Sequence, residues 1–158
     1  MSFVIRKAVK ADAKAAHEIR QRAIWAKCVD DYPEAQLKIW TEGGMSERFI
    51  ADIERAFYVA ESEQGVIGTA MLNTENGIGM VDAIFVAPDW MGKGVAKALM
   101  VHLETLARQS GVTALKLDAT LNAADFYRAS GFTGDEISVY RSPYGLELAC
   151  VPMVKSLN

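Results

Sequence analysis

The chain has 158 residues, of which 51% are hydrophobic and 23% are charged. This length fits one domain spanning residues 1–158, and the composition argues against disorder over most of the chain. Seventeen Lys and Arg against 20 Asp and Glu give a formal net charge of −3. A protein that grips nucleic-acid backbones normally carries a basic excess, so no nucleic-acid partner is expected.

The sequence carries no sign of a membrane segment or a metal site. No stretch of 18 apolar residues occurs, and the N-terminus lacks an apolar signal region. Cys28 and Cys150 are the only cysteines and lie far apart, as do His17 and His102. None of these four side chains has metal-ligand spacing, and two thiols make no disulfide framework. We therefore expect a cytoplasmic protein without a metal and without a membrane partner.

The N-terminal third is expected to be mostly helical. Residues 3–5 form a short apolar stretch typical of a strand. Asp12 is a candidate N-cap for a following helix, and Pro33 stands where a second helix can begin. Gly43 and Gly44 interrupt that helix, and Ser46 can cap a third.

The middle of the chain is predicted to form β-strands. Residues 57–60, 66–72 and 80–86 are rich in β-branched and aromatic side chains. The gaps between them are short, and Asn76-Gly77 is a turn signal. These three strands are therefore predicted to form an antiparallel meander.

The C-terminal half alternates helices and strands. A helix is predicted over residues 95–110, a strand over 113–118 and a short helix over 123–130. Two strands, over 139–141 and 146–151, flank the turn Ser142-Pro143-Tyr144-Gly145 and suggest a closing hairpin. The whole order predicts a mixed α+β domain around one sheet.

The stretch from Ile84 to Lys97 ends a predicted strand, turns through two glycines and starts a helix. Helix N-termini carry unpaired N–H groups and a positive dipole end, so this junction can bind an anion. A tight turn without a ligand is the alternative. A Walker loop is absent, and Lys97 occupies the third glycine position of a dinucleotide fingerprint.

Two segments resemble motifs of the GNAT superfamily of acyl-CoA-dependent N-acetyltransferases. Met91-Gly92-Lys93-Gly94-Val95-Ala96 is similar to the family's pyrophosphate-binding motif, Q/R-x-x-G-x-G/A. The segment from Leu117 to Phe132 is similar to its later strand, Asn-Ala, Phe-Tyr and Gly-Phe succession. The resemblance covers essentially the whole chain. It implies a mixed, mostly antiparallel sheet of about six to seven strands flanked by about four helices.

The resemblance also implies a binding site for acetyl-CoA as cosubstrate. Ile84, Phe85 and Val86 would lie along the pantetheine arm. The remaining cofactor-binding residues it implies are Met91, Gly92, Lys93, Gly94, Val95, Ala96, Lys97, Asn122 and Tyr127. Met91 departs from the family's usual Gln or Arg, which removes one polar contact and leaves the backbone cradle.

Tyr127 is the candidate general acid, because a phenol is protonated at neutral pH and can donate to a leaving thiolate. The resemblance places this tyrosine near the cofactor sulfur. Asp82 is the candidate base, and strand alternation puts it on the same side as Ile84 and Val86. Asp118 is the second choice, and either carboxylate could instead be a structural hydrogen-bond acceptor.

Asn122 precedes the helix of Tyr127, where it could cap that helix, contact the cofactor, or do both. The aromatic residues Trp25, Tyr32 and Trp40 lie where the family builds its acceptor site, although such spacing is more often that of core residues.

The leading hypothesis is an acetyl-CoA-dependent N-acetyltransferase acting on a primary amine of a small molecule or a peptide, by direct attack in a ternary complex. The alternative is a non-catalytic acyl-CoA-binding or regulatory module with the same fold, which the Met91 departure favours. The sequence leaves the identity of the amine open, and it is compatible with a homodimer.

Overall fold

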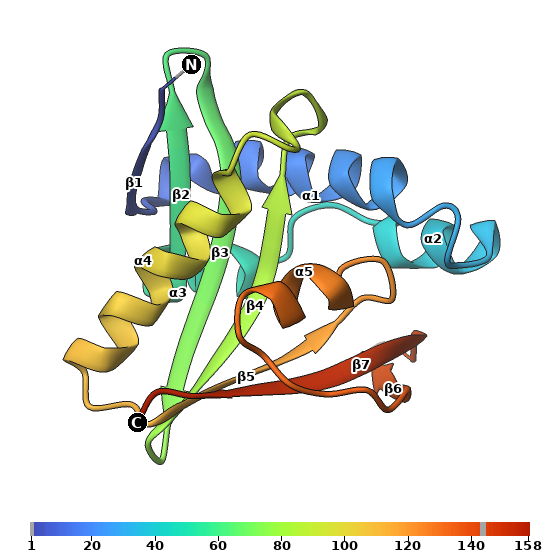
Figure 1. Ribbon diagram of the computed structural model, residues 1–158. Coiled ribbons are helices and arrows are strands. Elements are labelled where there is room, and N and C mark those ends of the chain that lie inside the picture. The colour runs from blue at the N-terminus through green and yellow to red at the C-terminus, as the bar shows by residue number, and fades with distance from the viewer. Residues whose placement is uncertain (1, 143–144) are drawn as a thin grey trace.

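The computed structural model describes residues 2–142 and 145–158. Over these residues it has seven strands and five α-helices, one helix more than expected (Figure 1). The strands are β1 (Val4–Lys7), β2 (Phe57–Ser62), β3 (Gly65–Glu75), β4 (Ile78–Val86), β5 (Ala114–Ala119), β6 (Ser138–Arg141) and β7 (Glu147–Ser156). The α-helices are α1 (Ala13–Lys27), α2 (Glu34–Thr41), α3 (Glu47–Ala56), α4 (Val95–Gln109) and α5 (Ala124–Ala129), with 3-10 turns η1 (Lys10–Asp12) and η2 (Pro88–Trp90).

The strands form one sheet in the order β1-β2-β3-β4-β5-β7-β6. All neighbouring pairs are antiparallel except β4 and β5, which are parallel. The predicted meander is β2–β3–β4, with Asn76 and Gly77 at its second turn. The mixed, mostly antiparallel α+β fold is thus confirmed. The predicted hairpin is β6–β7, although Pro143 and Tyr144 of its turn lie outside the described residues.

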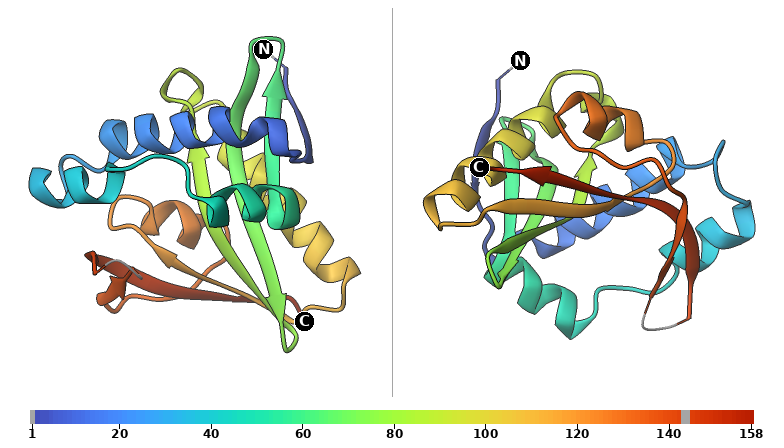
Figure 2. Two further views of the ribbon diagram at one scale, coloured as in Figure 1. Left: turned by 180° about the vertical axis from the view of Figure 1, so that it is seen from behind. Right: turned by 60° about the horizontal axis from the view of Figure 1, so that its bottom comes forward.

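The contact between β4 and β5 is short, and the two strands diverge beyond it (Figure 1). Pairing joins Ile78–Met80 to Ala114–Lys116. Gly79 lies at this closest approach, where an added Cβ would come within 2.8 Å of the Leu115 side chain. The rest of β4 runs away from β5, as the view from behind in Figure 2 also shows. The sheet is therefore open between these strands toward the C-terminal end of β4.

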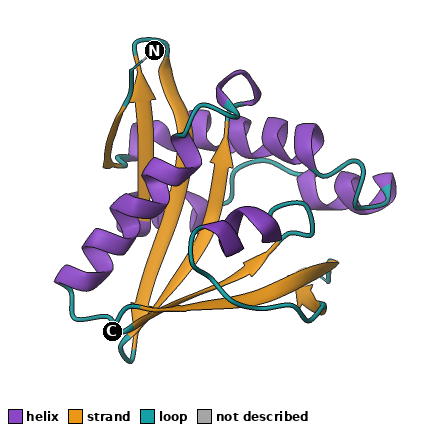
Figure 3. Cartoon of the chain, viewed as in Figure 1, coloured by secondary structure: helices purple, strands orange, loops and turns teal. Residues whose placement is uncertain are grey.

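Helices cover both faces of the sheet (Figures 2 and 3). On one face α4 and α5 close the main core, in which Leu99 and Leu103 are fully buried. On the other face α1 and α3 pack on β2 through a second cluster that includes Ile53 and Val59. A Cβ on Gly68 would lie 2.8 Å from Val95, so this glycine lets α4 approach β3 closely.

The predicted start and stop residues flank the helices, although not every candidate cap forms a side-chain bond. The Ser46 hydroxyl accepts a hydrogen bond from the Phe49 N–H at 3.0 Å, as expected of an N-cap. Asp12 precedes α1 but makes no side-chain capping bond to it. Its carboxylate instead accepts from the Val9 N–H at 2.8 Å and pairs with Arg6 in two hydrogen bonds of 2.8 and 2.9 Å. Asp12 therefore occupies the predicted N-cap position of α1, but a partly buried ion pair uses its side chain in place of a capping bond.

Candidate active site

The turn between η2 and α4 is shaped to receive an anion. Gly92 and Gly94 have φ of 77° and 85°, a conformation that favours glycine, and a Cβ at either position would meet only open space. The Ala98 N–H donates to the Gly94 carbonyl at 3.0 Å, so the N–H groups of residues 94–97 precede the helical hydrogen-bond ladder. Lys93 and Lys97 are exposed beside them. The residues present therefore fit a diphosphate group.

The side chain at the first position of this motif packs against the protein core instead of facing the anion site. Met91 is half-buried and packs against the main core, and its N–H donates to the Pro88 carbonyl at 3.3 Å. A thioether supplies only a weak acceptor. Anion binding at this turn therefore depends on backbone N–H groups and lysines rather than on a side chain at position 91.

A β-bulge interrupts β4 where it begins to leave β5. Met71 of β3 pairs with Asp82, but Thr69 pairs with Phe85, so β4 holds one extra residue at this point. Ala83 takes up the extra length with φ of 54°, and its carbonyl accepts a hydrogen bond from the buried Thr69 hydroxyl at 2.8 Å. Bulges re-aim side chains and backbone groups, and they occur often beside active sites.

The bulge overturns the prediction that Asp82 and Val86 share a face. Asp82 is opposite Met71, whose side chain packs with the cluster under α1 and α3. Val86 is opposite Gly68 and belongs to the main core under α4. Strict alternation would place both on one side, but the extra residue in β4 reverses the pattern between them. Asp82 therefore faces the α1 and α3 side.

Tyr127 lies on α5 with 9% of its surface exposed, between the rings of Phe126 and Phe132. Among the described residues no fully buried side-chain oxygen or nitrogen lacks a hydrogen-bond partner, so the Tyr127 hydroxyl is not an orphaned buried group. Burial raises the pKa of Tyr127 well above its usual value near 10, and the negative charge of Asp82 adds to this effect. The phenol is thus held protonated and within electrostatic reach of the candidate base.

Asp82 reaches solvent, but the surrounding protein removes enough water to raise the pKa of its carboxyl to about 6. The negative charges of Asp118 and Asp52 contribute to the shift. A carboxyl with a pKa near neutrality can both hold and release a proton under working conditions. The charge of Asp82 therefore acts on Tyr127, and the charge of Asp118 on β5 acts on Asp82.

Asn122 is placed differently from the capping prediction. Ala123 occupies the N-cap position of α5, and no side-chain capping bond is formed there. The Asn122 side-chain oxygen accepts a hydrogen bond from the Cys28 thiol at 3.4 Å. Asn122 therefore links the start of α5 to the end of α1, and its cofactor contact remains a prediction.

Tyr32 has a role that the sequence pattern did not reveal. Its hydroxyl donates to the Ala149 carbonyl at 2.5 Å and accepts from the Leu121 N–H at 3.1 Å. One side chain thus joins the segment after α1 to β7 and to the loop before α5. In the sequence, only its aromatic character and its place in the predicted acceptor region drew attention to Tyr32. Its partners lie 89 and 117 positions away.

The other two aromatic residues of this region are tied to the end of α2. The Trp25 indole N–H donates to the Thr41 hydroxyl at 3.0 Å, and the Trp40 ring packs edge-on against Tyr32. Both are half-buried beside the cluster formed by Ile24, Leu37 and Leu148. They therefore contribute to packing on the α1–α2 side of the opening.

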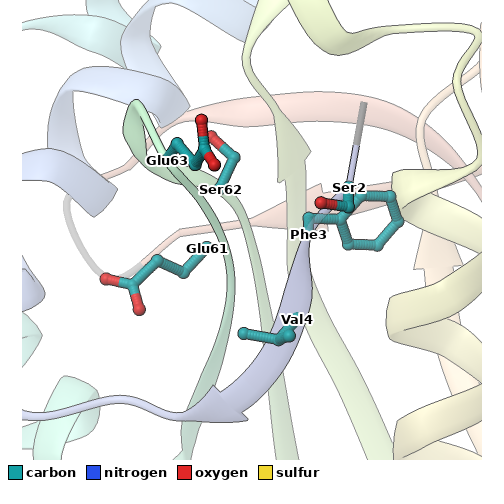
Figure 4. A pocket seen from close by; sticks show the side chains of 6 residues that line it. All are labelled: Ser2, Phe3, Val4, Glu61, Ser62 and Glu63. Carbon is teal, nitrogen blue, oxygen red and sulfur yellow. The ribbon is translucent and has the colours of Figure 1, made fainter.

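A hollow on the surface lies away from these residues (Figure 4). It is lined by Ser2, Phe3, Val4, Glu61, Ser62 and Glu63. Those residues come from the β1 edge and the β2–β3 turn, and two of them are carboxylates that would repel phosphates. Over the described part of the chain, no helix is long and apolar enough to cross a membrane, and no group of acidic, His and Cys side chains is arranged to hold a metal.

Comparison with known proteins agrees with this geometry. Residues 54–134, just over half of the chain, match the model of the acetyltransferase (GNAT) domain. A peptidyl-lysine N-acetyltransferase, YjaB of Salmonella typhimurium, is 30% identical over 141 residues, covering 84% of this chain and 92% of that one. An aminoglycoside N(6')-acetyltransferase type 1 of Stenotrophomonas maltophilia is 28% identical over 149 residues, covering 86% and 90%.

Solved structures show the same fold. A GCN5-related N-acetyltransferase from Rhodopseudomonas palustris superposes with a TM-score of 0.87 at 27% identity, covering 99% of this chain and 97% of that one. The PaiA N-acetyltransferase of Thermoplasma acidophilum, solved in complex with coenzyme A, has a TM-score of 0.80 at 19% identity and 99% coverage of both chains. The family match and these relatives define an acyltransferase. The chain belongs to the GNAT acetyltransferase family.

Proposed function

We propose that this protein transfers an acetyl group from acetyl-CoA to a primary amine, by direct attack of the amine within a ternary complex. The observation that carries the proposal is Tyr127, a buried tyrosine whose phenol is held protonated within electrostatic reach of Asp82. The named activities of the two curated relatives, toward aminoglycosides and peptidyl-lysine, support an amine as acceptor.

The cosubstrate would be held from the α4 side of the sheet. Its diphosphate would bind the N–H groups of Gly92, Gly94 and Val95, with the Lys93 and Lys97 side chains adding positive charge. Ile84, Phe85 and Val86 border the part of β4 that is not paired with β5. On the side facing away from β3, their backbone groups could pair with an extended amide-bearing arm, as an added strand would.

Acetyl-CoA supplies an activated thioester whose carbonyl an amine can attack. An amine attacks only in its neutral form, and Asp82 would accept its proton, either directly or through water. Because burial and neighbouring negative charge raise the pKa of Asp82 to about 6, this carboxylate is a stronger base than an ordinary aspartate and is still ionised at pH 7. The proton leaves the reacting centre as the new C–N bond forms.

Collapse of the tetrahedral species breaks the C–S bond, and the departing sulfur carries the electron pair. Tyr127 would donate its phenolic proton to that sulfur. Its raised pKa keeps the hydroxyl protonated before the step, so the proton is still present when the thiolate leaves. The phenolate so formed is then reprotonated, completing the cycle.

Direct attack is favoured over an acylated-enzyme route because both thiols are poor nucleophiles. Burial raises the pKa of Cys28 to about 11, and burial also raises the pKa of Cys150. A thiol reacts as the thiolate, which is scarce at neutral pH for such groups. Cys28 is moreover engaged with Asn122.

The test is single-turnover acetylation with a panel of primary amines. Free thiol from coenzyme A would be followed optically, and the acetylated amine would be identified by mass spectrometry. Amine-dependent thiol release with one acetylated product per thiol is expected. Saturable acetyl-CoA binding without thiol release from any amine would refute the proposal.

A further inference from the structure

The helix that carries Tyr127 is held at its two ends by different parts of the fold. At the C-terminal end, the Lys155 ammonium of β7 donates to the Ser130 carbonyl at 2.8 Å, and the Arg128 guanidinium donates to the Gly134 carbonyl at 3.0 Å. At the N-terminal end, no side chain of the described residues caps α5. The start of α5 therefore depends on contacts made by the loop that precedes it.

The Tyr32 hydroxyl holds this loop. Tyr32 is 5% exposed, and its hydroxyl accepts a hydrogen bond from the Leu121 N–H at 3.1 Å while donating to the Ala149 carbonyl at 2.5 Å. Burial raises the pKa of Tyr32, which keeps the hydroxyl protonated for this donation. One oxygen thus ties the loop before α5 to β7, and removing it takes away this partner of the Leu121 N–H.

Tyr32 is itself fixed by the ends of α1 and α2. Its N–H donates to the Cys28 carbonyl at 3.1 Å, and its ring packs edge-on against Trp40 with the ring centroids 6.1 Å apart. The Cys28 thiol donates to the Asn122 side-chain oxygen at 3.4 Å, which is a second tie to the same loop. Two consecutive loop residues, Leu121 and Asn122, are therefore held from the α1–α2 side.

Two backbone hydrogen bonds connect this loop to Tyr127. The Ala123 N–H donates to the Thr120 carbonyl at 3.0 Å, which closes a turn around Leu121. The Ala123 carbonyl accepts from the Tyr127 N–H at 3.2 Å, in the first turn of α5. A displacement of the turn at Leu121 would therefore displace the start of α5 and the backbone of Tyr127.

We infer that Tyr32 is a positioning residue for acetyl transfer, whose hydroxyl holds the turn before α5 so that the Tyr127 phenol meets the departing sulfur. This inference rests on the proposed function, in which Tyr127 donates the proton. Proton transfer needs the donor and the acceptor within hydrogen-bond reach, so a small displacement of Tyr127 slows the step. Tyr32 gives up no proton in the reaction and acts on it through Leu121.

The test is a double-mutant cycle between Tyr32→Phe and Tyr127→Phe, measured as single-turnover acetylation at saturating acetyl-CoA. The acceptor is the fastest amine of a primary-amine panel that includes kanamycin and Nα-acetyl-lysine amide. Tyr32→Phe keeps the ring against Trp40 and removes only the hydroxyl. We expect it to slow transfer about tenfold in the wild-type protein and less than about twofold in the Tyr127→Phe background. A merely structural role would lower the rate by the same factor in both backgrounds.

A control variant and a second readout separate positioning from loss of folding. Asp12→Asn removes a hydrogen-bonded ion pair between β1 and the start of α1, away from this loop, and should leave the transfer rate unchanged. In the wild-type protein, hydrogen exchange at the Leu121 amide should be at least about tenfold slower than in an unstructured chain. Tyr32→Phe should speed that exchange, and a melting curve shows that each variant is folded during the assay.

Wild-type exchange at the Leu121 amide as fast as in an unstructured chain would overturn the inference without any variant. Equal slowing by Tyr32→Phe in both backgrounds would also overturn it. These results are separable from a failure of the proposed function. Transfer that Tyr127→Phe slows and Tyr32→Phe does not would overturn the inference alone. Acetyl-CoA binding without transfer to any amine would refute the proposed function and the inference with it.

Discussion

The Thr69 hydroxyl of β3 donates a hydrogen bond to the Ala83 carbonyl of β4 at 2.8 Å, across the bulge between the two strands. Thr69 is buried, so this bond satisfies a group that would otherwise be costly to bury. It also holds Ala83 at a φ of 54°, which an alanine seldom adopts. The bulge places Asp82 on the α1 and α3 side while Val86 remains in the core under α4.

Replacing Tyr127 with Phe should slow acetyl transfer and leave binding intact. The departing thiolate would lose its proton donor, which we expect to reduce the single-turnover rate about 100-fold. The ring contacts with Phe126 and Phe132 survive the change, so acetyl-CoA affinity measured by calorimetry should stay nearly constant. Tyr58→Phe, at a half-buried tyrosine on β2, is the control. A transfer rate unchanged at every pH would show that Tyr127 is not the acid.

Replacing Gly94 with Ala should weaken cosubstrate binding. The residue has φ of 85°, and the added methyl would occupy the open space in front of the α4 N-terminus. Backbone strain should cost about 1 kcal/mol of unfolding free energy, and we expect acetyl-CoA affinity to fall about tenfold.

Gly43→Ala is a matched control for Gly94→Ala. Gly43 has φ of 84° and similarly open surroundings, but it lies in the loop after α2. Its substitution should cause a comparable loss of stability in urea unfolding and no change in acetyl-CoA affinity. Equal loss of affinity in both variants would point to global destabilisation rather than to a phosphate site.

Replacing Asp82 with Asn should change the pH profile of transfer. In the wild-type protein the rate should rise with pH through about 6, the raised pKa of this carboxyl. The amide cannot accept the proton, so the variant should lack that rise and should be slower at pH 7. Single-turnover rates between about pH 5 and pH 8 provide the measurement. If the rise persists in Asp82→Asn, another group is the base, and Asp118→Asn becomes the next variant to measure.

The same variant should be more stable than the wild-type protein at neutral pH. The folded-state pKa of Asp82 lies above the usual value of 3.8, so ionisation opposes folding, and this cost develops as pH rises from about 4 to 6. Because the side chain reaches solvent, screening limits the effect, and we expect Asp82→Asn to raise Tm at pH 7 by only about 2 °C. The gain should disappear below about pH 4. An equal gain at both pH values would indicate a cause other than charge.

Replacing Asp12 with Asn should destabilise the fold at neutral pH. The Asp12 side chain is 9% exposed, and hydrogen bonds from Arg6 hold the pKa of its carboxyl below the usual value. The ionised carboxylate therefore stabilises the fold above about pH 4, and this contribution is lost as pH falls through the lowered pKa. We expect a loss of about 2 kcal/mol of unfolding free energy at pH 7 and a smaller loss near pH 2.5.

Asp125→Asn is the matched control for the buried ion pair. Asp125 also pairs with an arginine, Arg128, at 2.7 Å, but its side chain is 96% exposed. Removing this pair should change the unfolding free energy by less than about 0.5 kcal/mol. Equal effects of the two substitutions would contradict a special contribution from burial.

Much of the fold could be predicted because its signals are local. Ser46 caps α3, and Gly111 and Gly131 follow the ends of α4 and α5 in the left-handed conformation, as their positions in the sequence suggested. The turn through Gly92 and Gly94 before the apolar face of α4 is equally local. Such features depend on a few consecutive residues, so one sequence is sufficient to predict them.

The arrangement of the catalytic side chains depends on distant contacts. Ala83 carries no sequence signal for a positive φ, so strand alternation assigned Asp82 and Val86 to one face. The bond from Thr69, 14 residues earlier, stabilises the conformation that separates them. Tyr32 likewise meets partners 89 and 117 residues away.

The sequence by itself determined the order of the elements and the glycine turn before α4, along with the side chains able to hold or move a proton. Only the tertiary structure decided that β4 and β5 separate after three paired residues, and that Asp82 faces the α1 and α3 side while Tyr127 lies in the core on the other face. The physical reason is that turns and caps are settled by neighbouring residues, whereas the spacing of charges across two strands is settled by packing over the whole sheet.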